Sequence, residues 1–246
     1  MKKLKDFVLI RINGSLGERL LIWASLIKLL AKRINSKFRN NKTETANGQL
    51  YVDLGLPSGL KWAKCNVGAT SETEYGYYFQ WGDIEDKSNA NCTWESYKYC
   101  NGSFDTLTKY NTFPLFGEKP DDKTKLDSED DAAKAHMGGD WRIPTKAEIQ
   151  ELLENTENEW VEDFNGSGVN GRKFSSKTNG NSIFIPAAGI YRGGSVDYVG
   201  SSGGIWSSSL KDDYPNLAWY LYFNSGDCYI YGSRRCIGRS VRGVMN

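Results

Sequence analysis

The chain has 246 residues, of which 39% are hydrophobic and 13% aromatic, enough to bury the core of one domain of about 200 residues plus an appendage. Its 26 glycines, 8 tryptophans and 14 tyrosines, against 6 prolines, predict many short strands and turns and exclude a disordered chain or a helical bundle. The net charge of +1 hides an asymmetry, because residues 1–47 carry 11 Lys and Arg against 3 Asp and Glu, while residues 48–246 carry 20 against 27. We therefore expect the two parts to have different roles.

Residues 15–34 have the pattern of an amphipathic helix. Ser15 and Glu18 form a capping box, after which apolar residues follow at alternating spacings of four and three. These residues are Leu16, Leu20, Trp23, Ile27, Leu30 and Ile34. We expect this helix to assemble a homo-oligomer through residues 15–38 or to dock on a partner. The alternatives are a helix that packs on the chain's own globular domain and one that lies on a membrane surface.

The same segment is not expected to cross a membrane or to direct secretion. Its longest uncharged run, Leu20 to Ile27, has eight residues, whereas a spanning helix needs about 20. Asp6 and Arg11 interrupt the first apolar stretch and no small-residue cleavage site follows, so no signal peptide is recognisable. The basic residues are spread out rather than clustered, and nucleic-acid binding is therefore not expected.

Residues 35–48 are polar and rich in Asn, Thr and Lys, which predicts a linker between an N-terminal segment, 1–47, and a globular domain, 48–246. Alternating apolar residues bounded by turn residues indicate the strands of this domain. They are predicted at residues 50–56, 60–65, 77–83, 181–189, 205–209, 218–223 and 239–244.

Two short helices are predicted between these strands. Ser128 is expected to cap a helix over 130–137, which Gly138 ends and which contains the chain's one histidine, His136. Thr145 and Glu148 form a second capping box, which opens a helix through Glu154. Grouped helices between two sets of strands predict an α+β domain.

Four side chains of the domain have a predicted structural role. Trp141 and Trp206 are expected in the core. Arg142 and Arg242 are expected to donate hydrogen bonds to backbone carbonyls of the long-loop region. Along residues 218–223 aromatic residues alternate, but the register that would say which face is exposed is not readable from the sequence.

Six separated blocks of the domain resemble a known family. They are YVDLGLPSGLKWAKCNVGA (51–69), EYGYYFQWGD (74–83), GGDWRIPTKAEIQELL (138–153), NSIFIPAAG (181–189), IWSSS (205–209) and GRSVRGV (238–244). In this order they resemble the Fibrobacter succinogenes major paralogous domain of Bacteroides-type bacteria and their phages. The resemblance covers about residues 50–246 and implies a C-type-lectin-like fold. That fold is shared with formylglycine-generating-enzyme-like domains and with the variable proteins of diversity-generating retroelements.

The resemblance also implies a binding region near the C-terminus. In retroelement variable proteins, adenines of Asn-type codons are replaced in this part of the domain, which corresponds to residues 206–244. The products of such replacement, and the Tyr, Ser, Gly, Asp and Arg mixture that suits recognition, mark the candidate ligand-binding residues. They are Lys211, Asp212, Tyr214, Asn216, Trp219, Asp227, Tyr229, Tyr231, Gly232, Ser233, Arg234, Cys236, Ile237 and Arg239. The alternative is that they are ordinary solvent-facing loop residues.

No catalytic site, metal or cofactor is expected. The five cysteines form no Cys-x-x-Cys unit, and their odd number defines no disulfide framework. Cys228 and Cys236 lie eight positions apart and do not match the thiol pair of formylglycine-generating enzymes. The acidic stretch 121–131 lacks the glycine and terminal glutamate of an EF-hand loop, so a solvated acidic loop is the better prediction.

These observations predict a diversified ligand- or receptor-binding protein rather than an enzyme. A phage or mobile-element adhesin, displayed as an oligomer on a virion or cell surface and binding a protein or glycan on another cell, fits the resemblance and the N-terminal helix. The alternatives are a bacterial surface or structural lectin-like module without variation and, less favoured, an enzyme of the formylglycine-generating type.

Overall fold

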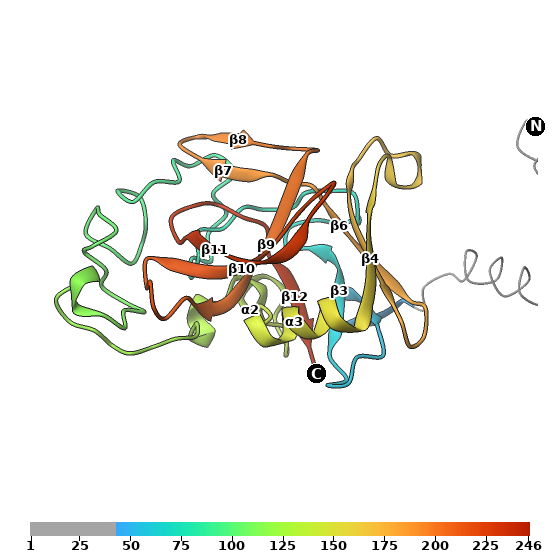
Figure 1. The fold of residues 1–246 in the computed structure, drawn as a ribbon, viewed down its shortest axis with the longest axis horizontal. Coiled ribbons are helices and arrows are strands. Elements are labelled where there is room, and N and C mark those ends of the chain that lie inside the picture. The colour runs from blue at the N-terminus through green and yellow to red at the C-terminus, as the bar shows by residue number, and fades with distance from the viewer. Residues whose placement is uncertain (1–42) are drawn as a thin grey trace, which may run out of the picture. The chain divides into compact units, whose positions relative to one another are not determined.

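The computed structural model describes residues 43–246, and Figure 1 shows short strands arranged in several small sheets with two helices along one side. One sheet has the order β1 (Thr43–Ala46), β2 (Gln49–Asp53), β3 (Lys61–Asn66) and β12 (Arg242–Met245). A second has the order β11 (Cys228–Arg234), β10 (Leu217–Asn224) and β9 (Ser202–Leu210). The others are β4 (Thr156–Val161), β5 (Gly171–Ser176) and β6 (Ser182–Pro186), and the pair β7 (Ile190–Arg192) and β8 (Ser195–Asp197). The helices are α2 (Ala132–Met137) and α3 (Lys146–Asn155), with single 3-10 turns at Pro114–Phe116, Ser128–Asp130 and Phe164–Gly166.

This composition agrees with the predicted α+β class, and a C-type-lectin-like fold is compatible with it. None of the helices in residues 43–246 has the length and hydropathy needed to cross a bilayer. The predicted oligomerisation helix at residues 15–38 lies outside the described residues. Strand β1 pairs with β2 through Thr43–Ala46, so the last part of the predicted linker 35–48 belongs to the folded domain. The sequence missed β1 because its residues are polar.

The strand predicted at residues 77–83 does not form. One isolated bridge, between Phe79 and Arg239, occurs there, and scattered backbone hydrogen bonds and tryptophan side chains hold the segment. The indole of Trp206 donates to the Phe79 carbonyl at 2.8 Å, and the indole of Trp81 donates to the Ser207 carbonyl at 2.7 Å. Tyr78, Phe79 and Trp81 are therefore buried without a regular sheet partner, which a strand pattern cannot distinguish.

The central sheet β11-β10-β9 separates two hydrophobic clusters. Ala218 and Tyr220 of β10 point into the first cluster, which contains Trp141 and Trp206, both 1% exposed or less. Leu221 of the same strand points into the second cluster, around Trp62 and α3. The prediction that Trp141 and Trp206 are core residues is confirmed. Because side chains pack on both faces of β10, this strand is a rigid support for the residues of the strands on either side of it.

Arg242 and Arg142, both predicted to donate to backbone carbonyls, have different hydrogen-bond partners. Arg242 is fully buried and donates to Asn66 Oδ1 at 2.9 Å and to the carbonyls of Ala63 and Phe184, both at 3.0 Å. The predicted donation to backbone carbonyls is thus confirmed, although these carbonyls belong to β3 and β6 and not to the long-loop region. The same prediction for Arg142 is wrong, because its guanidinium binds both carboxylate oxygens of Glu148, at 2.6 and 2.7 Å. A nearby carboxylate is a stronger acceptor than a carbonyl.

The two helices begin with different caps. Thr145 Oγ1 accepts from the Glu148 N–H and the Glu148 carboxylate accepts from the Thr145 N–H, which confirms the predicted capping box of α3. Helix α2 is capped by Asp131, whose carboxylate accepts from the Lys134 N–H, whereas the predicted cap Ser128 only begins a 3-10 turn. Gly138 ends α2 with φ of 65°, as predicted.

These caps predict a contrast between two conservative substitutions. Thr145→Ala should lower the free energy of unfolding by about 1 kcal/mol, because the Glu148 N–H loses its acceptor. Ser128→Ala should change it by less than about 0.3 kcal/mol, since the exposed Ser128 side chain makes no hydrogen bond among residues 43–246. Urea denaturation of both variants measures the difference, and equal losses would contradict the assignment of the caps.

Candidate ligand-binding surface

Four tyrosines gather on one side of the β10–β11 hairpin. The register places Tyr220 opposite Tyr231 and Tyr222 opposite Tyr229, and directly opposite residues share one face of a sheet. Ring centroids lie 6.3 Å apart for Tyr220 and Tyr222, 5.3 Å for Tyr222 and Tyr229, and 6.0 Å for Tyr229 and Tyr231. Tyr229 is 44% and Tyr231 59% exposed. We call these four residues the tyrosine face; it offers rigid amphipathic area to a ligand.

A groove lies beside the tyrosine face. It is lined by Ile190 and Arg192 of β7, Leu217 and Tyr220 of β10, Tyr231, Gly232, Ser233 and Arg234 of β11, and Ile237 and Arg239 beyond it. Three arginines and no acidic residue are in this lining. The Arg239 guanidinium lies 3.7 Å from the Tyr220 ring and donates to Ser233 Oγ at 2.9 Å. Burial lowers the pKa of Arg239 to about 10, so it is charged at pH 7.

Gly238 lets β7 approach the hairpin and form the wall of this groove. The Tyr191 N–H donates to the Gly238 carbonyl at 2.8 Å, and the Gly238 N–H donates back at 2.9 Å. A Cβ at Gly238 would lie 2.9 Å from Tyr191 Cβ, so a larger residue would push β7 away. The close approach requires glycine, and it brings Ile190 and Arg192 to a groove whose remaining residues come 25 or more positions later.

The loop between β9 and β10 forms a second candidate surface. The Tyr214 N–H donates to the Lys211 carbonyl, and Thr112 Oγ1 donates to the Asp212 carbonyl at 2.6 Å, which ties the loop to residues 103–117. The Lys211 ammonium lies 4.7 Å from the Tyr214 ring and 5.1 Å from the Trp219 ring. Tyr214 is 54% exposed. Trp219 points to the sheet face opposite the tyrosines, where Lys146 of α3 lies 3.8 Å from its ring.

Beneath both surfaces, Arg235 connects three segments. It is fully buried and donates to the Tyr97 hydroxyl at 2.8 Å and to the carbonyls of Pro215 at 2.8 Å and of Tyr110 and Lys109 at 2.9 Å. The Asn216 carbonyl accepts from the Arg235 N–H. One side chain therefore holds three segments together. They are the end of β11, the β9–β10 loop and the long irregular segment before α2 that contains Tyr97, Lys109 and Tyr110.

Comparison with protein families gives a match over most of this fold. A sequence model of the Lcl C-terminal domain matches residues 55–242, from the turn after β2 to the first residue of β12. The chain belongs to the Lcl C-terminal domain family. Comparison with curated proteins and with solved structures finds no match. The matched range includes both candidate surfaces.

The predicted binding residues of this Lcl C-terminal domain occupy different depths. Tyr229, Tyr231 and Arg234 are exposed, and Ser233, Ile237 and Arg239 are buried but line the groove floor. Cys236 corrects the prediction, because it is 3% exposed and packs in the first hydrophobic cluster, where its carbonyl accepts from Gln80. Asp227 is exposed in the β10–β11 turn, and Asn216 is half-buried.

Sequence reasoning missed the residues that complete the groove. Ile190 and Arg192 lie on β7, in a stretch for which the sequence predicted no strand, and Leu217 lies just before the predicted strand 218–223. Tyr220 lies within that strand, but which face it occupies was not predicted. The alternation along β10 was the one available signal for Tyr220 and Tyr222. It became informative only when the pairing with β11 was known.

The five cysteines of this Lcl C-terminal domain are all free thiols. Burial raises the pKa of Cys92 and of Cys228 to about 11, and that of Cys236 to about 12. Reactive cysteines have a pKa below the ordinary value, held down by a cation or a helix N-terminus. These thiols are therefore protonated at neutral pH.

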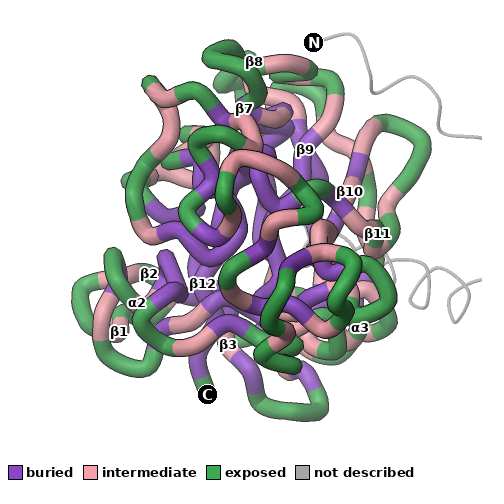
Figure 2. The backbone as a smooth tube through the Cα atoms, turned by 90° about the vertical axis from the view of Figure 1, so that its left-hand side faces the viewer, coloured by how far each residue is buried: buried purple, intermediate pink, exposed green. Residues whose placement is uncertain are grey.

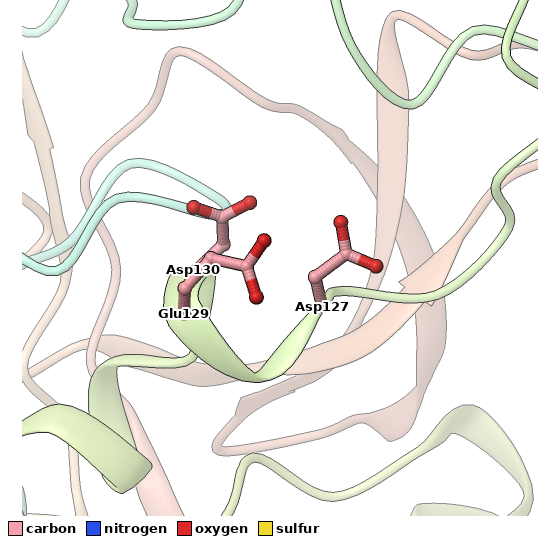
Figure 3. Close-up of side chains that lie close together, drawn as sticks. All are labelled: Asp127, Glu129 and Asp130. Atoms are coloured by element: carbon pink, nitrogen blue, oxygen red, sulfur yellow. The ribbon is translucent and has the colours of Figure 1, made fainter.

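The acidic stretch 121–131 contains three carboxylates that lie within 4.8 Å of one another: Asp127, Glu129 and Asp130 (Figure 3). The Lys109 ammonium lies 2.8 Å from Asp127, 3.6 Å from Glu129 and 2.6 Å from Asp130, where it supplies the compensating charge. Burial raises the pKa of Asp130, but hydrogen bonds from Lys109, Tyr110 and Tyr99 outweigh it and lower the pKa to about 2. The predicted solvated loop is thus partly a buried ion-pair network.

Proposed function

We propose that this Lcl C-terminal domain is a non-catalytic ligand-binding protein, and that the tyrosine face with its groove is the binding surface. One observation carries the proposal: two exposed tyrosines and an exposed arginine stand on the edge strand β11, whose partner β10 is packed on both faces. Tyr and Arg dominate binding hot spots, and a rigid base reduces the entropy lost on binding. The raised pKa values of Cys228 and Cys236 argue against a thiol enzyme.

We further propose that the surface is diversified by a retroelement. The Lcl C-terminal domain family is associated with variable proteins of that type, and along β11 the exposed residues Tyr229 and Tyr231 alternate with half-buried ones. Display as an oligomer on a virion or a cell surface would multiply weak sites, since linked sites raise apparent affinity about 100-fold or more. The target is then a protein or glycan on another cell.

Deep sequencing of the coding region from a host population tests this diversification. Substitutions should concentrate at adenines in codons for exposed residues such as Tyr229, Tyr231 and Arg234. Codons for the buried Arg235 and Arg242 should stay unchanged, because these side chains hold the scaffold. A flat distribution would reject diversification and leave a fixed lectin-like surface module.

Binding itself is tested by exchanging one aromatic side chain. Tyr229→Ala should lower the affinity for target cells about 10-fold, as is typical for loss of an interfacial tyrosine. Phe104→Ala, at a residue 46% exposed against 44% for Tyr229, is the control and should leave affinity unchanged. Flow cytometry of labelled protein on a panel of intact bacterial strains measures both. Equal effects would move the binding surface away from the hairpin.

The thiols provide a test of the non-catalytic assignment. A Cys228→Ser, Cys236→Ser double variant should bind target cells as well as the unmodified protein does. In the native protein, Ellman's reagent at pH 8 should react slowly with Cys92 and Cys236, which are buried, and with all five thiols once urea unfolds the chain. A thiol that reacts at once in the native state would support an enzyme instead.

A further inference from the structure

Strand β11 has one edge without a partner. In the order β11-β10-β9 it pairs only with β10, from Cys228 to Arg234. Within residues 43–246, no backbone hydrogen bond outside this pairing involves residues 228–233. Unpaired strand edges are templates for added strands, and proteins usually shorten or cover them. Figure 2 draws β10 and β11 at the margin of the domain, with exposed and half-buried segments along the hairpin.

The groove adjoins the end of this strand. Tyr231, Gly232, Ser233 and Arg234 are consecutive, and all four line it together with Leu217 and Tyr220 of the paired strand β10. Successive side chains of a strand point to opposite faces. Contact with four consecutive residues therefore brings the groove close to the backbone of β11 as well as to its side chains.

The charge of the groove indicates the kind of ligand that it can bind. Arg192, Arg234 and Arg239 line it without an acidic residue, although residues 48–246 carry 27 Asp and Glu against 20 Lys and Arg. Arg192 is paired with Asp197 at 2.8 Å, whereas Arg234 is exposed and has no ion pair in the described part of the chain. Arg239 donates to a single hydroxyl, which satisfies only part of its five N–H donors. An occupant with carboxylates complements Arg234 and the remaining donors of Arg239.

We propose that β11 accepts an extended, acidic segment of a target protein as an added strand beside the tyrosine face. Backbone hydrogen bonds to the β11 edge hold the segment, acidic side chains on one of its faces meet Arg234, and the alternate side chains pack on Tyr231, on the face where Arg239 lies. This inference rests on the proposed function, which it narrows from any ligand to an extended polypeptide.

The experiment uses the full chain and a displayed library of random linear 12-residue peptides. Selected peptides should be enriched in Asp and Glu, and Arg234→Ser should weaken them at least 10-fold. The matched control is Lys173→Ser, at a half-buried cation on β5, and should leave their affinity unchanged. Each peptide is then resynthesised with a single N-methyl group at each backbone position in turn.

The N-methyl series distinguishes strand addition from other modes of binding. An added strand donates hydrogen bonds from every second N–H, so affinity should fall at least 10-fold at alternate positions and stay unchanged between them. A loss without this period of two overturns strand addition but keeps the binding surface. Failure to select peptides that depend on Arg234, with cell binding still lost in Tyr229→Ala, overturns the polypeptide ligand in favour of a glycan. Intact cell binding in Tyr229→Ala overturns the proposed function itself.

Discussion

Arg235→Met is expected to lower the free energy of unfolding by about 4 kcal/mol, the range found when one partner of a buried charged network is removed. Methionine keeps an unbranched apolar side chain as far as the Nε position but leaves the Pro215, Tyr110 and Lys109 carbonyls without their donor. The loss also removes the guanidinium that lies 4.9 Å from the Trp81 ring. Urea denaturation at pH 7 measures the change.

The neighbouring arginine is the control for this experiment. Arg234 is exposed and has no ion pair among residues 43–246, so Arg234→Met should change the free energy of unfolding by less than about 0.5 kcal/mol. Two adjacent residues of one type then separate stability from binding, because Arg234 contributes to the groove and Arg235 to the scaffold. Similar losses in the two variants would mean that β11 is placed in the wrong register.

Arg234 and Arg235 show which features of the structure could be predicted from the sequence and which could not. Local signals worked where a few neighbouring residues decide the structure, as in the capping box of Thr145 and Glu148 and the helix stop at Gly138. Nothing in a Ser-Arg-Arg-Cys sequence says which arginine is buried. The answer depends on residues 109 and 215, which a loop and a turn bring to the same place.

The candidate site was predictable in part for the same reason. The hairpin residues were found from composition and family resemblance, which need no knowledge of pairing. The groove also requires Arg192, which reaches it through the contact between Tyr191 and Gly238, 47 positions apart in the chain. Contacts of that separation are set by tertiary packing. The same limit applies to Cys236, whose place in the first hydrophobic cluster is set by residues distant in the chain.

Asp130→Asn is expected to lower the free energy of unfolding by about 2 kcal/mol at pH 7, with a dependence on pH that identifies the cause. The native carboxylate accepts from Tyr110 at 2.6 Å and from Tyr99, and it pairs with Lys109 and Lys98. Its folded pKa of about 2 is below the ordinary value of 3.8. The stabilisation by the charged form is therefore complete above about pH 5 and is lost as the pH falls through 4 toward 2.

The difference in free energy of unfolding between the unmodified protein and Asp130→Asn should consequently shrink as the pH falls from 5 to 2. Urea denaturation repeated across that range measures it. Asp105→Asn is the control, since Asp105 is exposed and makes no hydrogen bond in the described part of the chain, and its difference should stay near zero throughout. A loss in Asp130→Asn that does not change with pH would mean that the amide disturbs packing around Tyr99 and Tyr110. A loss of stability that disappears at low pH would establish that the Lys109 ammonium and the two tyrosine hydroxyls stabilise a charged carboxylate. This network then holds in place the long irregular segment before α2, on which the Arg235 contacts depend.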